Sequence, residues 1–296
     1  MMRGCSTRSG RRVGVAGGSL LLGAALLGNV TLASAQAVAV QEPVPGVLVI
    51  TTPAGNSIAS VGPDGAVVAG VQSPLTTAAI EAELARRTAS ARRFVVLAPG
   101  DSGIVAGDAG WTALGATVVA HELTRPRLEK WAGGRGARLP IVTYSQVIAF
   151  DLNNESVHVV HMPAGYSDDD AIVHFHHAKV IHLGSSLTTD GYPHVDLSQN
   201  GSIDGIIETV GRFLDSPAET RFVPRRGPLA RPAELVEYHA MLTAIRDSVR
   251  ALVKSGLSEE RVVAARPTAA YDARWGTARI TPDQFVRMVY RSRSAS

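Results

Sequence analysis

Short apolar runs bounded by turn residues alternate with helical patterns along most of the chain, and this order constrains the fold more than any other feature. Strands are predicted near residues 47–50, 57–61, 66–69, 94–97, 116–120, 142, 147–150, 157–160, 171–175, 179–183 and 221–223. Helices are predicted over residues 75–90, 127–131, 203–214, 234–254, 258–264 and 282–289. Strands with helices, followed by strands with helices again, predict an α/β fold in which two β-sheets pack face to face with helices outside.

Residues 1–35 are predicted to be a signal peptide that is removed. Four arginines, the last of them Arg12, precede an apolar stretch rich in small residues. An A-x-A cleavage site then ends at Ala35. A retained transmembrane anchor is the alternative, which the glycines and the cleavage site disfavour. We therefore expect one mature domain, residues 36–296, in the periplasm or outside the cell.

Removing this segment changes what charge and cysteine content imply. The segment holds four arginines and no acidic residue, so the formal net charge falls from +3 to about −1. It also holds Cys5, the only cysteine, which leaves the mature chain without disulfide or thiol chemistry. The basic balance of the whole chain is thus no sign of nucleic-acid binding, and the few aromatic residues offer no stacking platform for bases. We expect no nucleic-acid partner, and no membrane association after cleavage.

Four stretches together resemble one known group of proteins. They are GNSIASVGPDG at residues 55–65, GATVVAHE at 115–122, DGYP at 190–193 and YDARWG at 271–276. Their order and spacing, from about residue 46 to 290, resemble exported members of the metallo-β-lactamase fold superfamily. The resemblance implies an αββα four-layer sandwich and hydrolysis at one or two zinc ions held by histidines and carboxylates.

The positions at which that family places its metal ligands hold other residues in this chain. The loop that binds zinc in the family corresponds to residues 94–108, FVVLAPGDSGIVAGD. The replacements are Pro99, Asp101, Gly103 and Ile104 in this loop, and Tyr166, Ser185 and Arg226 in three later motifs. Gly70 stands where an acidic residue commonly supports the site. The resemblance therefore implies a zinc site that has lost its ligands, and we expect no zinc and no other cofactor.

The same replacements indicate a different kind of ligand. Arg226 would repel a cation and supplies positive charge where the family holds metal, and Asp101 could pair with it. Tyr166 can fill the space of an imidazole and donate one hydrogen bond. We hypothesise that the former cleft holds a small anionic ligand and is lined by Arg225, Arg226, Tyr166, Ser185 and Asp101. The alternative is a filled and inert cleft.

Two further patterns have simpler interpretations. Residues 100–103 read GDSG, as around the nucleophile of serine proteases, but the first histidine, His121, follows the serine instead of preceding it. Residues 168–170 are three aspartates that lack the spacing of a calcium-binding EF-hand loop. We expect Asp168 and Asp170 to cap a turn before the strand that begins near Ala171.

Histidines gather in the second half of the chain. His174 and His176 are two residues apart, so they share a strand face and could chelate a metal, with His182 on a neighbouring strand. The alternative, which we favour, is a solvated strand end followed by a turn at residues 177–179.

These observations favour an exported, non-hydrolytic pseudo-enzyme with a binding or accessory role. The alternative is a hydrolase of the same superfamily that uses a metal site relocated to the histidine-rich strands, or a mechanism without metal.

Overall fold

The computed structural model describes residues 38–70, 74–97, 111, 114–132 and 139–292. All of them belong to one compact unit, Gln36–Ser296. The predicted site residues Pro99, Asp101, Gly103 and Ile104 lie outside the described residues. In the part of the chain that is described, no helix is both long and apolar enough to cross a membrane.

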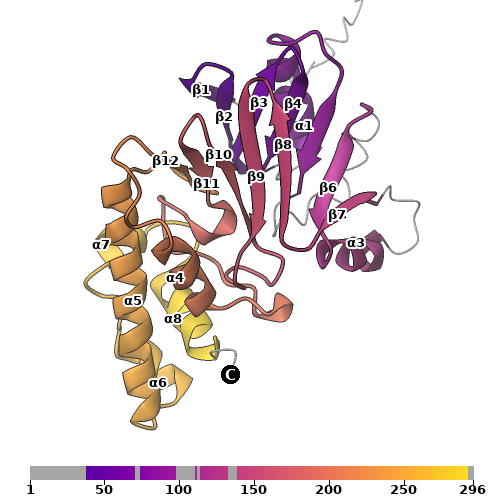
Figure 1. Cartoon of the computed structure of the whole chain (residues 1–296). Coiled ribbons are helices and arrows are strands. Elements are labelled where there is room, and N and C mark those ends of the chain that lie inside the picture. The colour runs from indigo at the N-terminus through magenta and orange to yellow at the C-terminus, as the bar shows by residue number, and fades with distance from the viewer. Residues whose placement is uncertain (1–37, 71–73, 98–110, 112–113, 133–138, 293–296) are drawn as a thin grey trace, which may run out of the picture. The chain divides into compact units, whose positions relative to one another are not determined.

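The first sheet has seven strands in sequence order (Figure 1). They are β1 (Ala39–Val44), β2 (Val47–Thr52), β3 (Gly55–Gly62), β4 (Gly65–Ala69), β5 (Arg93–Val96), β6 (Thr117–His121) and β7 (Val142–Tyr144). Strands β1 to β4 pair antiparallel, and β4 to β7 pair parallel. The central strands β3 and β4 are buried along almost their whole length, as expected of strands that are covered on both faces.

The second sheet has five strands in the order β12-β11-β10-β9-β8. They are β8 (Val147–Leu152), β9 (Glu155–His161), β10 (Ala171–Phe175), β11 (Val180–His182) and β12 (Arg221–Val223). Strands β8 to β11 are antiparallel, and β12 pairs parallel with β11.

Two hairpin turns from different sheets bond to each other. Pro63 and Asp64 join β3 to β4, as the turn signal predicts, and Asn153 and Asn154 join β8 to β9. Both asparagines have a positive φ, which a two-residue hairpin of this twist requires and asparagine tolerates. The Asp64 amide donates to Oδ1 of Asn153 (3.0 Å), and the Asn153 amide donates to Asp64 (2.8 Å). These bonds tie the first sheet to the second at the end of the sandwich where the two turns lie.

The helices lie on the outer faces of the two sheets (Figure 1). The helices of the described chain are α1 (Pro74–Ala85), α3 (Thr124–Ala132), α4 (Ile203–Gly211), α5 (Pro232–Lys254), α6 (Glu259–Ala264), α7 (Asp272–Trp275) and α8 (Pro282–Arg291), with short 3-10 turns η1 (Gly184–Ser186) and η2 (Leu197–Gln199). Helices α1 and α3 cover the first sheet, and helices α4 to α8 cover the second.

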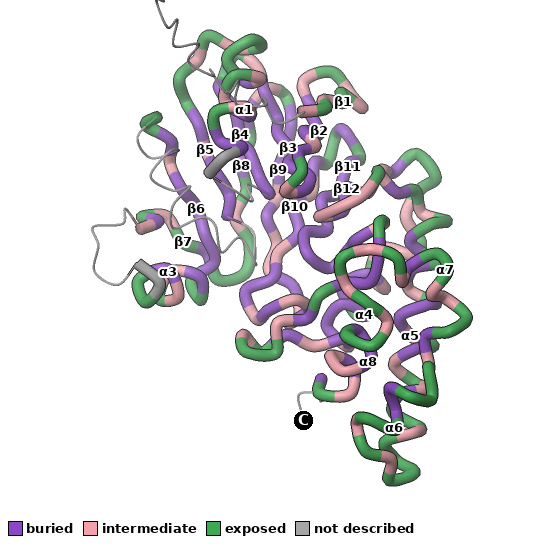
Figure 2. The backbone as a smooth tube through the Cα atoms, turned by 180° about the vertical axis from the view of Figure 1, so that it is seen from behind, coloured by how far each residue is buried: buried purple, intermediate pink, exposed green. Residues whose placement is uncertain are grey.

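Three buried clusters separate these layers. The middle cluster lies between the sheets and includes Val49 and Val67 of the first sheet with Val159 and Phe175 of the second. Figure 2 shows strands of both sheets largely buried, whereas α5 and α6 expose one side. The outer clusters join each sheet to its helices, for example Ile181 of β11 to helices α4, α5 and α8. The αββα sandwich expected from the sequence is therefore confirmed.

Every predicted strand and helix is present, but the sequence missed β1 and α7 and made two helices too long. The helix predicted over residues 203–214 ends at Gly211. β1 contains Gln41, Glu42 and Pro43 and has no apolar alternation, so its strand form comes from pairing with β2 at the sheet edge. The helix predicted over residues 75–90 ends at Ala85. Beyond it, the Thr88 hydroxyl accepts from the Ser90 amide (3.1 Å), a local bond that competes with helix.

Candidate functional site

A pocket of about 490 Å³ lies where loops from both sheets meet. The first sheet contributes the β2–β3 turn, and the second contributes the loops after β9, β11 and β12. A segment before α8 closes the remaining side. Four of the residues predicted to line a ligand cleft line this pocket: Tyr166, Ser185, Arg225 and Arg226. The fifth, Asp101, lies outside the described residues.

Arg226 holds backbone carbonyls at the pocket edge. Its Nη1 donates to the carbonyl oxygens of Ala54 (2.7 Å) and Pro53 (3.2 Å), and its Nη2 donates to Pro53 (3.1 Å). Its own carbonyl accepts from the Thr189 amide (3.0 Å). Arg226 thus ties the loop after β12 to the β2–β3 turn. Its predicted pairing with Asp101 stays a prediction.

The Arg225 side chain contacts Ser185, which stands at another of the family's metal-ligand positions. Its Nη1 donates to the Ser185 hydroxyl (3.2 Å), and its amide donates to the carbonyls of Gly184 (3.1 Å) and Leu187 (2.9 Å). Arg225 is half-buried and Ser185 is buried. The backbone bonds fix the base of the Arg225 side chain, so its guanidinium is held beside Ser185 in the pocket wall.

Asn56 supports this loop from beneath, a role that the sequence did not reveal. Its Nδ2 donates to the carbonyls of Pro224 and Gly227 (both 2.9 Å), and its Oδ1 accepts from Thr51 (2.8 Å). Its amide donates to the Arg225 carbonyl (2.9 Å). The one sequence feature that could have indicated this role is the position of Asn56 in the G-N-S stretch that resembles the family. A β3 side chain thus positions both arginines, although 169 positions separate Asn56 from Arg225 in the sequence.

The pocket rim carries two residues that sequence reasoning missed, His194 and Arg279. The His194 ring lies 5.5 Å from the Tyr166 ring, centroid to centroid. Burial lowers the pKa of His194, Asp196 opposes this shift, and Arg279 and Arg225 reinforce it. The lowered pKa favours the neutral form of His194. The described residues of the pocket wall include three guanidinium groups and one carboxylate, that of Asp190. The wall is positive, which favours an anion.

Of the two aspartates predicted to cap a turn, Asp170 does so, whereas the Asp168 side chain pairs with Arg127. Asp170 accepts from the amides of Tyr166 (2.6 Å) and Ser167 (3.3 Å). Asp168 and Asp169 form ion pairs with Arg127 of α3. Burial raises the pKa of Asp170 to about 7, and the charge of Asp169 adds to this shift while the amide bond from Tyr166 opposes it. These bonds set the backbone of Tyr166 at the pocket wall.

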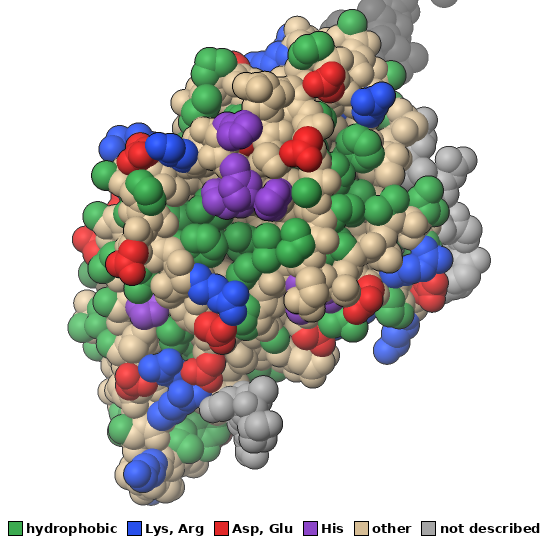
Figure 3. All heavy atoms as spheres, in the orientation of Figure 1, with side chains coloured by type: hydrophobic (Ala, Val, Ile, Leu, Met, Phe, Trp, Pro, Cys, Tyr) green, Lys and Arg blue, Asp and Glu red, His purple; other side chains and the backbone are tan. Residues whose placement is uncertain are grey.

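His158, His174 and His176 come together on the outer face of the second sheet. The rings of His174 and His176 stack at 3.9 Å, and those of His158 and His176 lie 4.3 Å apart. Figure 3 shows the histidine side chains gathered over β9 and β10. The predicted turn follows, with the Lys179 amide donating to the His176 carbonyl (3.3 Å). Within the described ranges, no three His, Cys, Asp or Glu side chains are arranged to hold a metal ion.

His182 does not join the other histidines. It is 2% exposed in β11, and a Cβ placed on Gly70 would lie 3.1 Å from its Nε2 atom. That nitrogen has no hydrogen-bond partner among the residues that the structure describes. Burial lowers the pKa of His182 to about 4, with a contribution from the charge of Arg225. His182 is therefore a neutral, desolvated imidazole just behind the arginine loop.

We expect His182 to make the fold sensitive to acid. Its folded pKa of about 4 lies below the ordinary value of 6.5. The neutral form is therefore the one the fold prefers, and stability is lost as pH falls from the unfolded pKa toward the folded one. The loss from this residue is on the order of 3 kcal/mol across that window. Free energies of unfolding in urea, measured at steps of pH, check the expectation.

His182→Leu removes this titration, so the variant should lose less stability than the parent over the same pH window. His174 has a similarly lowered pKa, about 4, and will keep part of the acid sensitivity. His177→Leu is the control, because His177 is exposed in a turn. Equal pH dependence in the parent and the His182→Leu variant would contradict the expectation.

The donor groups at the described positions do not fit the zinc that the family resemblance implies. Tyr166 and Ser185 offer neutral hydroxyls, Arg226 is a cation, and Gly70 has no side chain. Zinc takes imidazole, thiolate and carboxylate ligands, and a guanidinium repels it. The described family positions therefore lack the donor groups that zinc prefers.

Solved structures provide the comparison with known proteins, since no protein-family model and no curated protein matches the chain. A metallo-β-lactamase from Pontibacter korlensis is 16% identical, with a TM-score of 0.54 over 70% of this chain and 99% of that one. The DIM-1 metallo-β-lactamase is 12% identical, with a TM-score of 0.57 over 70% and 97%. The sec-alkylsulfatase Pisa1 from Pseudomonas sp. is 12% identical, with a TM-score of 0.63 over 86% of this chain and 50% of that one. At these identities the likeness is one of fold.

Proposed function

We propose that this chain, which has the metallo-β-lactamase fold, is an exported and non-hydrolytic binding protein that takes a small anion into the arginine-lined pocket. The observation that carries the proposal is that three guanidinium groups line one pocket, and that one of them, Arg226, stands where the family places a metal ligand. Arg225 and Arg226 occupy one loop of that pocket, and Arg279 lies on its rim. Export is proposed from the basic and apolar residues 1–35 and their cleavage site.

The pocket favours a small anion for three reasons. Its volume of about 490 Å³ is that of a small-molecule site. Arginine forms two parallel hydrogen bonds to carboxylate or phosphate groups. Hydroxyl groups of Tyr166 and Ser185 lie in the same wall and can donate to the ligand.

The relocated-metal hydrolase receives less support from the geometry. Its relocated metal site needs His174, His176 or His182 to converge with Asp101, which lies outside the described residues, on one cavity. His174 and His176 stack as rings, whereas His182 is buried beside Gly70. The test of the proposed function still includes this alternative as one outcome.

The test uses the full chain, without a histidine tag, produced in a bacterial host and purified from the periplasm or the medium. Its mass should correspond to an N-terminus at Gln36. After dialysis against excess zinc and then buffer, mass spectrometry should find far less than one zinc per chain. Stoichiometric zinc would instead support the hydrolase.

Arg225→Ala should weaken anion binding by about tenfold to a hundredfold, because a charge-assisted hydrogen bond of about 1.5–3 kcal/mol is lost. Isothermal titration with sulfate measures the change. Arg212→Ala is the control, since it removes the same charge from the exposed end of α4, where Arg212 pairs with Glu208 at 2.8 Å. Equal affinities of the two variants for sulfate would rule out the pocket as the anion site. Arg226 is a poorer probe, because its removal also frees the β2–β3 turn.

A further inference from the structure

His194 lies among groups that decide whether it can carry a proton. Tyr166 faces it from the β9–β10 loop, Arg225 from the loop after β12, and Arg279 from the segment before α8. Asp190 and Asp196 belong to its own loop. The His194 ring is partly desolvated by the pocket wall, but the residue as a whole is exposed, so it can exchange protons with solvent.

The nearest carboxylate on this loop is already occupied. Asp196 accepts from the amide (3.0 Å) and hydroxyl (2.6 Å) of Ser198, and Gln199 donates to its other oxygen. These bonds cap η2. Asp196 favours a proton on His194, but desolvation of the ring, reinforced by the charges of Arg279 and Arg225, outweighs it and lowers the pKa of His194.

Arg279 differs from Arg226 in its contacts. The guanidinium of Arg226 is committed to backbone carbonyls, whereas Arg279 is exposed and has no hydrogen bond or ion pair to any described residue. Arg279 can therefore turn its donors to a ligand. Together with Arg225 it offers two cationic groups at the same rim as His194.

We propose that the pocket binds a small doubly charged oxyanion and takes up a proton on His194 as it does so, so that His194, Arg225 and Arg279 hold the ligand together. This proposal rests on the proposed function. A bound dianion places negative charge beside the ring and so offsets the desolvation and the arginine charges that disfavour the imidazolium, which then donates an N–H to the ligand. The chemical class is that of sulfate, a phosphate ester or a dicarboxylate.

The sign of the pH dependence follows from linkage. In the free protein the pKa of His194 is lowered by burial and by the two arginines. In the complex the anion raises it, so the complex binds more protons than the free protein does. Affinity is then constant well above the pKa of the complex, rises as pH falls through it, and levels off below the pKa of the free protein. Each unit between these two pKa values is worth a factor of about ten in affinity.

The experiment is calorimetric titration of the mature protein with sulfate, whose charge stays constant over the range used. We expect sulfate to bind about three to ten times more tightly at about pH 5.5 than at about pH 8. Repeating the titration near pH 6.5 in two buffers of different ionisation enthalpy should show a net uptake of protons. This second readout needs no variant. His194→Gln should bind sulfate with little dependence on pH.

His239→Gln is the matched control, because His239 lies on α5 outside the pocket. Methyl phosphate and succinate, titrated at about pH 8 where both are dianions, distinguish a phosphate ester from a dicarboxylate as the preferred ligand. Binding that Arg225→Ala weakens, but that is independent of pH and takes up no protons, would overturn this inference and leave the proposed function standing. Absence of sulfate binding at every pH would overturn both.

Discussion

Gly205→Ala should destabilise the fold by about 3 kcal/mol or more, because the new methyl group has no room. Gly205 lies in the first turn of α4, directly against the β9–β10 loop. A Cβ on it would lie 1.9 Å from the carbonyl oxygen of Ala164 and 2.3 Å from its carbonyl carbon. Both are backbone atoms, so no side chain can rotate away. The free energy of unfolding in urea measures the loss.

The same contact sets the position of Tyr166. The Ser202 hydroxyl caps α4 by accepting from the Gly205 amide (3.0 Å) and donates to the Ala164 carbonyl (2.9 Å). Tyr166 lines the pocket and lies two residues after Ala164 in the β9–β10 loop. A shift of Ala164 would therefore displace Tyr166 from its position in the pocket wall. We expect a Gly205→Ala protein that still folds to bind sulfate more weakly than the parent.

Gly211→Ala is the control within the same helix. A Cβ at Gly211 would lie 3.4 Å from Nε2 of His239, an ordinary contact. Because alanine has the better helix propensity, this variant should be neutral or more stable by up to about 1 kcal/mol. If Gly205→Ala costs less than about 1 kcal/mol, the β9–β10 loop can move away from α4, and the close approach does not constrain the fold.

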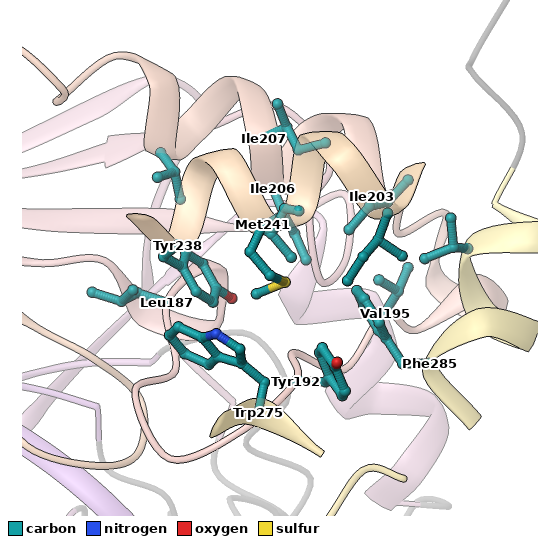
Figure 4. Packing of buried hydrophobic residues seen from close by; sticks show 14 of the residues in the cluster. Leu187, Tyr192, Val195, Ile203, Ile206, Ile207, Tyr238, Met241, Trp275 and Phe285 are labelled. Atoms are coloured by element: carbon teal, nitrogen blue, oxygen red, sulfur yellow. The ribbon is translucent and has the colours of Figure 1, made fainter. Parts of the chain in front are cut away.

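Phe285→Ala should cost about 3–5 kcal/mol, the range for removing a fully buried aromatic ring. Phe285 is 0% exposed on α8, and its ring stacks on that of Tyr192 at 4.6 Å with an interplanar angle of 6°. Figure 4 shows the two rings side by side, with Val195 next to Phe285. The side chain thus joins α8 to the loop of residues 190–196, and its loss leaves a cavity between them. Thermal and urea unfolding measure the effect.

Val253→Ala provides the comparison for Phe285→Ala. Val253 is 41% exposed on α5, so shortening it should change the free energy of unfolding by no more than about 0.5 kcal/mol. Tyr192 lines the pocket, and its hydroxyl donates to Asp272 (3.0 Å). Phe285→Ala should therefore also weaken sulfate binding, whereas Val253→Ala should not. A cost below about 2 kcal/mol for Phe285→Ala would mean that the neighbouring side chains collapse into the cavity.

The order of elements was predictable because it depends on local periodicity. Each apolar run from Val47 to Val223 forms a strand, and each helical pattern forms a helix. The reason is that the apolar residues recur with the period of the element whose face they bury. The errors fall where local pattern is weak. β1 forms only because β2 offers an edge, and α1 ends early because Thr88 and Ser90 bond locally.

The candidate site was predictable in part. Tyr166, Ser185, Arg225 and Arg226 were identified through the family's motif positions, and they line one pocket. The different contacts of the two arginines were not predictable. Arg226 faces the carbonyls of the β2–β3 turn, and Arg225 faces Ser185. This arrangement depends on the bonds from Asn56 to Pro224 and Gly227, which flank the two arginines.

The sequence by itself determined the αββα architecture and the absence of imidazole and carboxylate ligands at the described family positions, because periodicity and residue identity are local properties of the chain. The tertiary structure alone decided that His194 and Arg279 share a rim with Arg225, and that His182 is buried apart from His174 and His176. These groups come from different loops and strands, and their distances, exposure and pKa values exist only once the two sheets have packed.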